Sequence, residues 1–423
     1  MAPQGQFVVV ADSPTPEVVE ALQAAGAFRI VEANWVDAPS VLATVQPEGV
    51  VVAELPSDRA RAAAQAQALA DQLRGASGPF TPVVARMRDE GAPFLPNALP
   101  IAAKAPAERI AARLASALRI RTLHGTVLRR MQALASRGEQ PPALADSDPL
   151  EDASVLVAGR GRSYLALSVA VGERVGLVGA LSVESAVRAL NARDVDGLVI
   201  GDGFSPRVVE ALLTVLAGDT RFCDLPVAVL GYHPSTIEPF CPRLSNLERI
   251  AEGPRRLLER FLPFVRLHAF AERLKRMQQS LDAKGIIDPD TGLLAHEAFW
   301  RDLSRAVDDA EKRGVGLSIA RFCFEGGDHR TGRDAARLLA RLMRQVDFAC
   351  RERDNSIFAV FTDTDLRTAH VVARRLASVL KNTTLAPAAN GAAIESAVTL
   401  ATLKPTDNVD SLIARVSGEL ATT

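Results

Sequence analysis

Short apolar runs alternate with amphipathic stretches through the first 120 residues of the chain. The apolar runs have the length of buried strands, and the stretches between them have the periodicity of helices packed on one side. Five such repeats predict a parallel sheet covered by helices on both faces, an α/β fold. The predicted strands are residues 7–11, 28–32, 50–53, 82–85 and 99–102, and the clearest predicted helices are residues 17–25, 38–45 and 107–118.

The same alternation begins again after residue 152. The segment from Glu48 to Glu54 parallels the segment from Asp196 to Asp202, because in both an acidic residue and a glycine precede an apolar run that ends on a carboxylate. A repeat of this kind predicts two copies of one domain. The predicted strands of the second copy are residues 154–158, 174–178, 197–201 and 226–230, with a fifth near 246–251.

Two further segments connect the predicted domains. Residues 137–152 are rich in Pro, Ser, Asp and Glu, which is typical of a linker. Residues 253–284 have the pattern of a long amphipathic helix, which either packs on its own domain or forms a dimer seam. We expect a first domain over residues 1–125, a linker over 126–152, a second domain with its connecting helix over 153–284, and a third domain over 285–423.

Composition narrows the class of protein. The 49 basic and 50 acidic residues nearly cancel, so no global field draws the chain to nucleic acid or to an anionic membrane. The apolar runs are too short to span a bilayer, and the N-terminus has no secretory pattern. The four cysteines lack C-x-x-C spacing, which argues against zinc and for a reducing compartment. We therefore expect a cytoplasmic protein without nucleic acid and without membrane insertion.

The C-terminal third resembles a known family. It opens with DPDTGLL at residues 288–294, and a predicted helix (297–313), strand (316–324), helix (333–343) and strand (358–361) follow. This order resembles the GGDEF domain of diguanylate cyclases, whose opening turn reads D-x-L-T-G-L; Asp290 stands here in place of the leucine. The resemblance implies an α+β nucleotidyl-cyclase-like fold for this domain.

The two N-terminal domains resemble response-regulator receiver domains. That resemblance implies two flavodoxin-like domains, each a doubly wound parallel sheet. The order receiver–receiver–GGDEF is similar to that of the PleD-type cyclases, and the decay of the catalytic residues is similar to that of the non-catalytic PopA type. The resemblance covers nearly the whole chain and is stronger in the C-terminal third than in the receivers.

The residues that the family uses for catalysis are missing. A metal-binding aspartate late in the first strand of the GGDEF domain corresponds here to Arg321, or to Phe322 or Cys323 in a shifted register. The signature turn before Phe358 reads DNSI, the loop at 325–331 has no asparagine to read guanine, and Gly-Gly-Asp at 326–328 lies before a helix instead of in the hairpin. Because magnesium needs hard carboxylate ligands, we expect no metal and no cyclase activity.

A ligand site of the family is retained in the sequence. Arg344 and Asp347 match the R-x-x-D signature of the inhibitory site for cyclic di-GMP, and Arg375, with Arg374 beside it, matches a second arginine clamp. Arg351 lies in the spacer that follows and also begins an R-x-x-D match with Asp354. A guanidinium can donate to a phosphate or to the O6/N7 edge of guanine, and a carboxylate can accept from guanine N1 and N2. The resemblance implies cyclic di-GMP as the ligand.

The receiver-like domains keep only part of a phosphorylation site. Glu54 occupies the phosphoacceptor position of the first domain, with Asp12 left from the acidic pair and Lys104 from the lysine signature. Glu54 either mimics a phosphorylated aspartate or is a relic. Asp202 occupies the acceptor position of the second domain, but the first strand there ends on Ala-Gly-Arg without acids for a metal. We expect this domain to act in dimerisation or docking.

These observations give one leading hypothesis and two alternatives. The leading hypothesis is a non-catalytic cyclic di-GMP effector that forms a homodimer through its receiver domains and recruits protein partners. The resemblance extends this to cell-cycle control at the cell pole and to partners in proteolysis or polar localisation. The first alternative is a residual diguanylate cyclase, which GTP turnover would favour. The second is a nucleotide-free scaffold, which pairing of Arg344 with protein acids would favour.

Overall fold

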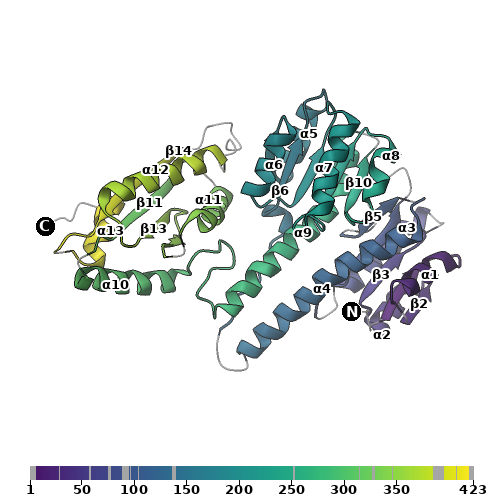
Figure 1. The fold of residues 1–423 in the computed structure, drawn as a ribbon. Helices are drawn as coiled ribbons and strands as arrows, with labels where there is room; N and C mark the ends of the chain where they lie inside the picture. Colours follow the sequence, from purple (N-terminus) through teal and green to yellow (C-terminus); the bar gives the residue numbers. More distant parts are fainter. Residues whose placement is uncertain are drawn as a thin grey trace. The chain divides into compact units, whose positions relative to one another are not determined.

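A computed structural model describes most of the chain (Figure 1). The described residues are 6–27, 29–56, 59–74, 78–87, 95, 97–102, 104–135, 140–250, 253–313, 315–325, 329–344, 346–383, 395–405 and 407–418. Phe28 of the second predicted strand, part of the predicted linker, and residues 326–328 therefore lie outside them. The chain divides into two compact units, one formed by Met1–Ala133 and Ala145–Leu274 and the other by Leu134–Leu144 and Lys275–Thr423.

The first unit contains two parallel sheets. The first sheet has the order β2-β1-β3-β4-β5, the doubly wound order of flavodoxin-like proteins. Apolar side chains of alternate strand residues pack on α1 and α4 at one face and on α2 and α3 at the other, which confirms the predicted two-sided sheet. Its elements are β1 (Gln6–Val10), α1 (Pro16–Ala24), β2 (Arg29–Ala33), α2 (Ala38–Val45), β3 (Gly49–Val52), α3 (Arg59–Arg74), β4 (Val83–Met87), β5 (Leu99–Ala102) and α4 (Ala107–Ala135).

The second sheet repeats this topology. Its order, β10-β9-β8-β6-β7, is the same doubly wound arrangement counted from the start of the domain. Its elements are β6 (Ser154–Ala158), α5 (Tyr164–Gly172), β7 (Gly176–Ala180), α6 (Val183–Ala192), β8 (Gly197–Ile200), α7 (Pro206–Gly218), β9 (Val227–Leu230), α8 (Pro234–Ile237), β10 (Leu247–Ile250) and α9 (Pro254–Asp282), with short 3-10 helices at Pro149–Glu151 and Glu238–Phe240.

Several boundaries differ from the predictions; α11, for example, begins at His329 instead of residue 333. The second strand of this domain begins at Gly176 instead of residue 174, because the N–H groups of Arg174 and Val175 still bond the carbonyl of Val171 at the end of α5. Helix α4 continues to Ala135, so residues 126–135, which we assigned to the linker, are helical. The buried side chain of Val127 explains this extension, since burial of apolar surface stabilises the added turns.

The sequence repeat has a packing explanation. A Cβ on Gly49 would lie 2.9 Å from Leu114 of α4, and a Cβ on Gly197 would lie 2.8 Å from the ring of Phe261 of α9. Each glycine therefore lets the last helix of its domain approach the central strand closely. The preceding acid Asp196 accepts a hydrogen bond from the N–H of Ser154 at 2.9 Å and lies 3.2 Å from His268 of α9.

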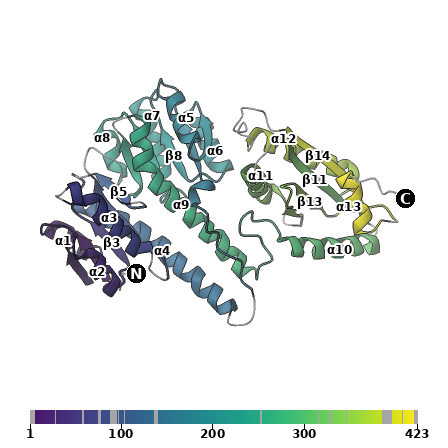
Figure 2. The ribbon, with the colours of Figure 1, turned by 180° about the vertical axis from the view of Figure 1, so that it is seen from behind.

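Helix α9 packs on both domains of the first unit. Leu257, Phe261 and Val265 lie in the core of its own domain, whereas Phe264 and Leu267 join the core of the first domain. Figure 2 shows α9 and α4 as the long helices that lie between the two sheets. Because one chain covers both sides of this helix, the structure favours intrachain packing over a dimer seam for this part of α9.

A buried ionic cluster lies where these two domains meet. Arg113 of α4 is fully buried, and its guanidinium donates to the carbonyl of Pro100 and to Glu248 of β10, the latter at 2.6 Å. Arg109 and Arg260 also reach the Glu248 carboxylate, at 3.4 and 3.2 Å. Strand β10 is therefore covered by α4 of the first domain.

The C-terminal domain is α+β, as predicted. Its strands are antiparallel in the order β12-β13-β11-β14, and the chain order β-α-β-β-α-β is that of a ferredoxin-like fold. Helices α11 and α12 cover one face, and α10 and α13 cover the other. The elements are α10 (His296–Arg313), β11 (Ser318–Glu325), α11 (His329–Leu342), β12 (Phe348–Arg351), β13 (Ile357–Phe361), α12 (Leu366–Thr383), β14 (Glu395–Thr402) and α13 (Val409–Ser417).

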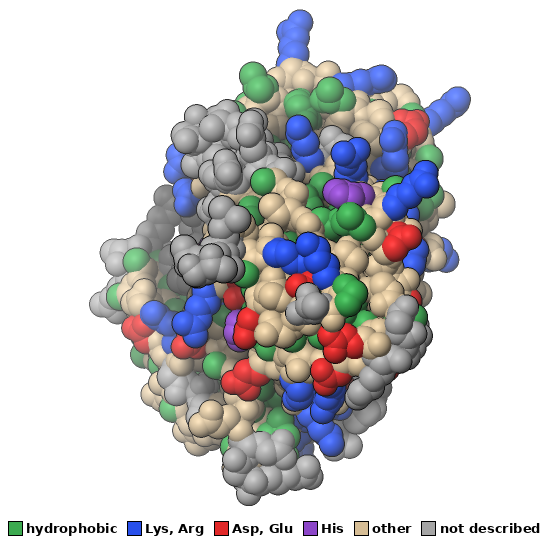
Figure 3. All heavy atoms as spheres, turned by 90° about the vertical axis from the view of Figure 1, so that its left-hand side faces the viewer, with side chains coloured by type: hydrophobic (Ala, Val, Ile, Leu, Met, Phe, Trp, Pro, Cys, Tyr) green, Lys and Arg blue, Asp and Glu red, His purple; other side chains and the backbone are tan. Residues whose placement is uncertain are grey.

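Two predictions from composition concern the surface charge and the absence of a membrane-spanning helix. The face in Figure 3 carries basic and acidic side chains interspersed, with basic groups gathered toward the top of that view. In the described part of the chain, no helix has both the length and the apolar character needed to cross a membrane.

Candidate functional site

The predicted ligand segment lies between the end of α11 and the start of β12. The N–H of Asp347 bonds the carbonyl of Arg344 at 3.0 Å, and the Asp347 carboxylate accepts from the N–H of Thr362 at 3.1 Å, just after β13. Burial raises the pKa of the Asp347 carboxyl, while the Thr362 N–H and Arg344 act in the opposite direction. Asp347 is therefore a fixed, half-buried acceptor at this edge of the sheet.

Arg344 is exposed beside this acceptor. No hydrogen bond or ion pair holds its guanidinium within the described residues. Its planar set of donors is therefore available to an external anion or to a base edge.

Arg374 and Arg375 lie on α12, which covers the same face of the sheet as α11. Both side chains are exposed, and neither has a hydrogen bond or ion pair among the residues that the structure describes. Among the described residues, the structure thus presents three unpaired arginines, two from α12 and one from the turn after α11.

Arg351 has an internal role instead. Its guanidinium donates to Asn355 at 2.8 Å and lies 3.9 Å from the carboxylate of Asp290. Its side chain is only 10% exposed, and burial lowers its pKa, which Asp290 partly opposes. Arg337 donates to the Asp290 carbonyl at 2.8 Å, so the opening turn is fixed to α11 and β12. We therefore leave Arg351 out of the candidate ligand site.

Arg321 is the residue that the resemblance matches to a metal ligand, with Phe322 or Cys323 as the match in a shifted register. Phe322 points into the core, whereas Arg321 lies on the other face of β11, opposite Phe358. Its guanidinium donates to Asp354 at 2.6 Å and to the Ser356 hydroxyl at 3.2 Å, and it lies 5.6 Å from the Phe358 ring centroid. Burial acts to raise the pKa of Asp354, but hydrogen bonds from Ser356 and Arg321 together hold it below its usual range. The Arg321 guanidinium thus neutralises the Asp354 carboxylate in this turn.

The turn itself is closed by its own side chains. The Ser356 N–H and hydroxyl both donate to Asp354, at 2.9 and 2.7 Å, and Asn355 adopts a left-handed φ of 67°. Asn355 supplies the conformation that glycine would otherwise provide. No group of three or more His, Cys, Asp or Glu side chains suited to a metal ion occurs among the described residues.

The predicted acceptor position of the first domain, Glu54, lies just after the end of β3. Glu54 and Asp12 meet at the carboxyl end of the sheet, where the Glu54 carboxylate accepts from the Ser13 N–H at 3.1 Å and Asp12 accepts from the Trp35 N–H at 3.4 Å. The Trp35 indole donates to the Glu54 carbonyl at 2.9 Å. Lys104 follows β5 at the same edge and is exposed. The acceptor-position carboxylate is therefore bonded to the loop after β1.

The second receiver-like site is closed more tightly. The Asp202 carboxylate accepts from the N–H of Ser163 at 3.2 Å and from the Ser163 hydroxyl. A Cβ on Gly161 would lie 2.3 Å from the Asp202 carboxylate, so the glycine loop closes directly over it. Asp202 therefore caps the start of α5, a role that the sequence did not indicate. The sequence feature that could have indicated this capping role is the segment Gly159 to Ser163 before α5, which contains no acidic residue of its own.

Replacing Asp202 with alanine is expected to lower the free energy of unfolding by about 1 kcal/mol, since loss of a helix cap usually costs this much. Urea titration followed by circular dichroism measures the change. Glu173→Ala, at the opposite end of α5, is the matched control and should leave stability unchanged. An equally stable Asp202→Ala protein would contradict the capping role.

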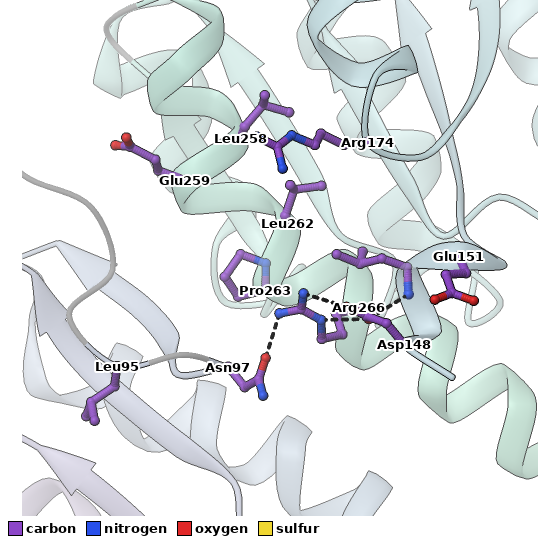
Figure 4. Close-up of a pocket in the computed structure, with 11 residues that line it drawn as sticks. Leu95, Asn97, Asp148, Glu151, Arg174, Leu258, Glu259, Leu262, Pro263 and Arg266 are labelled. Carbon is purple, nitrogen blue, oxygen red and sulfur yellow. Dashed lines mark hydrogen bonds and ion pairs between the residues drawn. The ribbon is translucent and has the colours of Figure 1, made fainter. Parts of the chain in front are cut away.

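One described pocket, of about 480 Å³, lies at the joint of the two domains in the first unit (Figure 4). Arg266 bridges it, donating to Asn97 at 2.5 Å and to both carboxylate oxygens of Asp148 at 2.9 Å. None of the predicted site residues lines this pocket, and the pairing of Arg266 gives it a role in holding the joint.

Comparisons with known proteins gave structural similarities only. No family model and no curated protein matches the chain. The chain is similar to the coiled coil and GGDEF domain of DgcB from Caulobacter crescentus in complex with c-di-GMP, with 19% identity over 36% of this chain and 86% of that chain and a TM-score of 0.30. The FimX GGDEF domain from Pseudomonas aeruginosa gives 24% identity, coverages of 31% and 90%, and a TM-score of 0.27.

The diguanylate cyclase SiaD from Pseudomonas aeruginosa, in complex with its activator SiaC, gives 18% identity, coverages of 35% and 63%, and a TM-score of 0.29. Similarities of this size do not establish the fold or the ligand of this chain. Both are therefore argued from its own topology and residues.

Proposed function

We propose that the C-terminal domain is a degenerate GGDEF domain that binds cyclic di-GMP as a signal and does not synthesise it. The observation that carries the proposal is the exposed, unpaired guanidinium of Arg344 beside the ordered carboxylate of Asp347. A nucleotide-free scaffold would be favoured if protein acids engaged Arg344, and no described residue does so.

The chemistry of these side chains suits a guanine nucleotide with phosphodiester groups. Arg344 can donate two parallel hydrogen bonds to guanine O6 and N7 or to a phosphate. Asp347 can accept from guanine N1 and N2 through the oxygen that Thr362 leaves available. Arg375, with Arg374 beside it, supplies further positive charge from α12 for the second phosphate.

The proposed loss of cyclic di-GMP synthesis rests on the side chains around the turn after β12. Transfer of a nucleotidyl group needs divalent metal at the triphosphate, and carboxylates must hold that metal. Arg321 is a cation at one ligand position, and its ion pair with Asp354 occupies an acid that could otherwise contribute. The residual cyclase is therefore the weaker alternative.

The N-terminal unit supplies the output in this proposal. Both receiver-like domains have their acceptor-position carboxylates bonded to backbone, which favours docking over phosphotransfer. We propose that the chain forms a homodimer through these domains and recruits protein partners. The family resemblance adds the cell pole and proteolysis or polar-localisation factors as the context to test.

Calorimetric titration of the full chain with cyclic di-GMP tests the ligand. We expect a micromolar or tighter Kd for the unmodified protein. Arg344→Ala should weaken binding by about 10–100-fold, because a bidentate arginine contact contributes about 1–3 kcal/mol.

Arg353→Ala is the matched control, since it removes one exposed arginine from the neighbouring turn and should change the Kd less than about twofold. Absence of binding by the unmodified protein would favour the scaffold. Equal binding by Arg344→Ala would move the site elsewhere. Conversion of GTP with magnesium into cyclic di-GMP, followed by chromatography, would support the cyclase alternative.

A further inference from the structure

The two parallel sheets of the first unit have four outer strands, and three of them are protected. Strand β5 is buried from Leu99 to Ile101. Strand β10 is covered by α4 of the first domain, where Arg109 donates to the Leu247 carbonyl and Arg113 to Glu248. Strand β2 carries exposed Arg29 and Glu32, and charges on an edge strand oppose pairing with another chain. The fourth outer strand, β7, has neither form of protection.

Strand β7 reads GLVGA, with no charge and no proline, and it pairs with β6 on one side only. The N–H of Gly176 bonds Ala153, and the carbonyl of Ala180 accepts from Gly159, so residues 176, 178 and 180 face β6. The backbone groups of Leu177 and Gly179 therefore point outward from the sheet, because the direction alternates along a strand.

An apolar helix face continues this open edge. Helix α5, YLALSVAVG, contains no charged residue, yet only Leu167 and Val171 are buried. Leu165 and Val169, one turn apart, are 74% and 56% exposed, and Leu181, directly after β7, is 61% exposed. Tyr164 of α5 lies over the strand, since a Cβ on Gly179 would be 2.5 Å from its hydroxyl. The strand and the helix thus form one apolar surface, which we name the β7–α5 surface.

We propose that the β7–α5 surface binds a second copy of this chain, with the two β7 strands antiparallel about a twofold axis at Val178. In this register Leu177 and Gly179 of the two copies exchange their outward hydrogen bonds, and the two Val178 residues form the non-hydrogen-bonded pair. Each leucine faces a glycine over which Tyr164 of that copy lies, so leucine and tyrosine meet across the axis, and no like charges oppose each other.

A second copy fits this surface better than a single extended peptide. A peptide strand would satisfy the backbone of β7 but would leave Leu165 and Val169 in water. A twofold partner brings its own α5 to the same side, so strand and helix are covered together. The proposal assigns the surface for the homodimer of the proposed function and does not depend on the ligand.

Sedimentation velocity of the full chain without nucleotide is the first test. We expect a dimer at micromolar concentration. The double variant Leu165→Glu with Leu181→Glu should raise the dimer Kd by at least about tenfold, because carboxylates replace buried apolar contacts at both halves of the interface.

The control is Val36→Glu with Val215→Glu, which adds the same charge at comparably exposed valines on other elements and should leave the dimer unchanged. A monomeric unmodified protein would overturn both the homodimer and this surface. A dimer that persists in the Leu165/Leu181 variant would overturn the surface alone.

Cross-linking gives an independent measurement. A Val178→Cys variant should form a disulfide-linked dimer on mild oxidation, because Cα atoms of a non-hydrogen-bonded pair lie about 4.5 Å apart, within disulfide range. Val208→Cys, on α7, should not. The unmodified protein shows whether the four native cysteines contribute. Equal cross-linking of both variants, or of neither, would contradict the twofold pairing.

Discussion

Replacing Glu248 with glutamine is expected to lower the free energy of unfolding of the first unit by about 3 kcal/mol. Glu248 supplies the carboxylate in contact with Arg113, which is fully buried, and it also contacts Arg109 and Arg260. Burial lowers the pKa of Arg113, and Glu248 opposes that effect. With a neutral side chain at residue 248, the fully buried Arg113 would lose its counter-charge beside two further, partly exposed guanidinium groups.

Calorimetry or urea unfolding measures this change, which corresponds to a fall in melting temperature of roughly 6–12 °C for a unit of this size. Glu259→Gln is the matched control. It removes an Arg–Glu pair whose arginine, Arg255, is 93% exposed, and such pairs contribute under about 1 kcal/mol. Equal effects of the two substitutions would show that water enters the joint between the domains.

Replacing Phe264 with alanine is expected to lower the free energy of unfolding by about 3–5 kcal/mol, the usual effect of removing a buried aromatic ring. Phe264 belongs to α9, but its ring lies in the core of the first domain, and the Arg113 guanidinium lies 4.5 Å from its centroid. The substitution would therefore leave a cavity in the core of the first domain, although α9 follows the second domain in the sequence. Proteolysis within residues 78–135 should accelerate together with the loss of stability.

Phe204→Ala provides the comparison for this second prediction. Its ring also lies beneath an arginine, Arg160, at 5.7 Å, but it is only partly buried at the surface of the second domain. We expect a cost of roughly 1 kcal/mol, because less apolar surface returns to water. A similar small cost for Phe264→Ala would mean that the two domains do not share a core.

The element order was predictable because apolar periodicity reports burial directly. The alternation predicted two parallel sheets and the family resemblance implied an α+β domain, and the topology confirms both fold classes. The segment Asp196 to Asp202 was identified as a repeat of Glu48 to Glu54. The glycine of each segment packs against the last helix of its domain, Gly49 against α4 and Gly197 against α9. Boundaries were less accurate, since α4 and β7 depend on contacts at their ends.

The candidate site was predictable only in part. Arg344 and Asp347 were chosen by their place in the family resemblance, and the structure leaves the first unpaired among the described residues and the second half-buried. Arg351 was placed in the same group, but its partners Asn355 and Asp290 come from a turn and a segment that spacing does not bring together.

By itself, the sequence determined the fold class and the repeat, because both depend on residue type and local order. Tertiary structure decided which charges are paired. It placed Arg321 against Asp354, Ser163 against Asp202 and Arg113 against Glu248. It also packed the first domain against β10 while leaving β7 open, because exposure of an edge depends on which domain packs beside it.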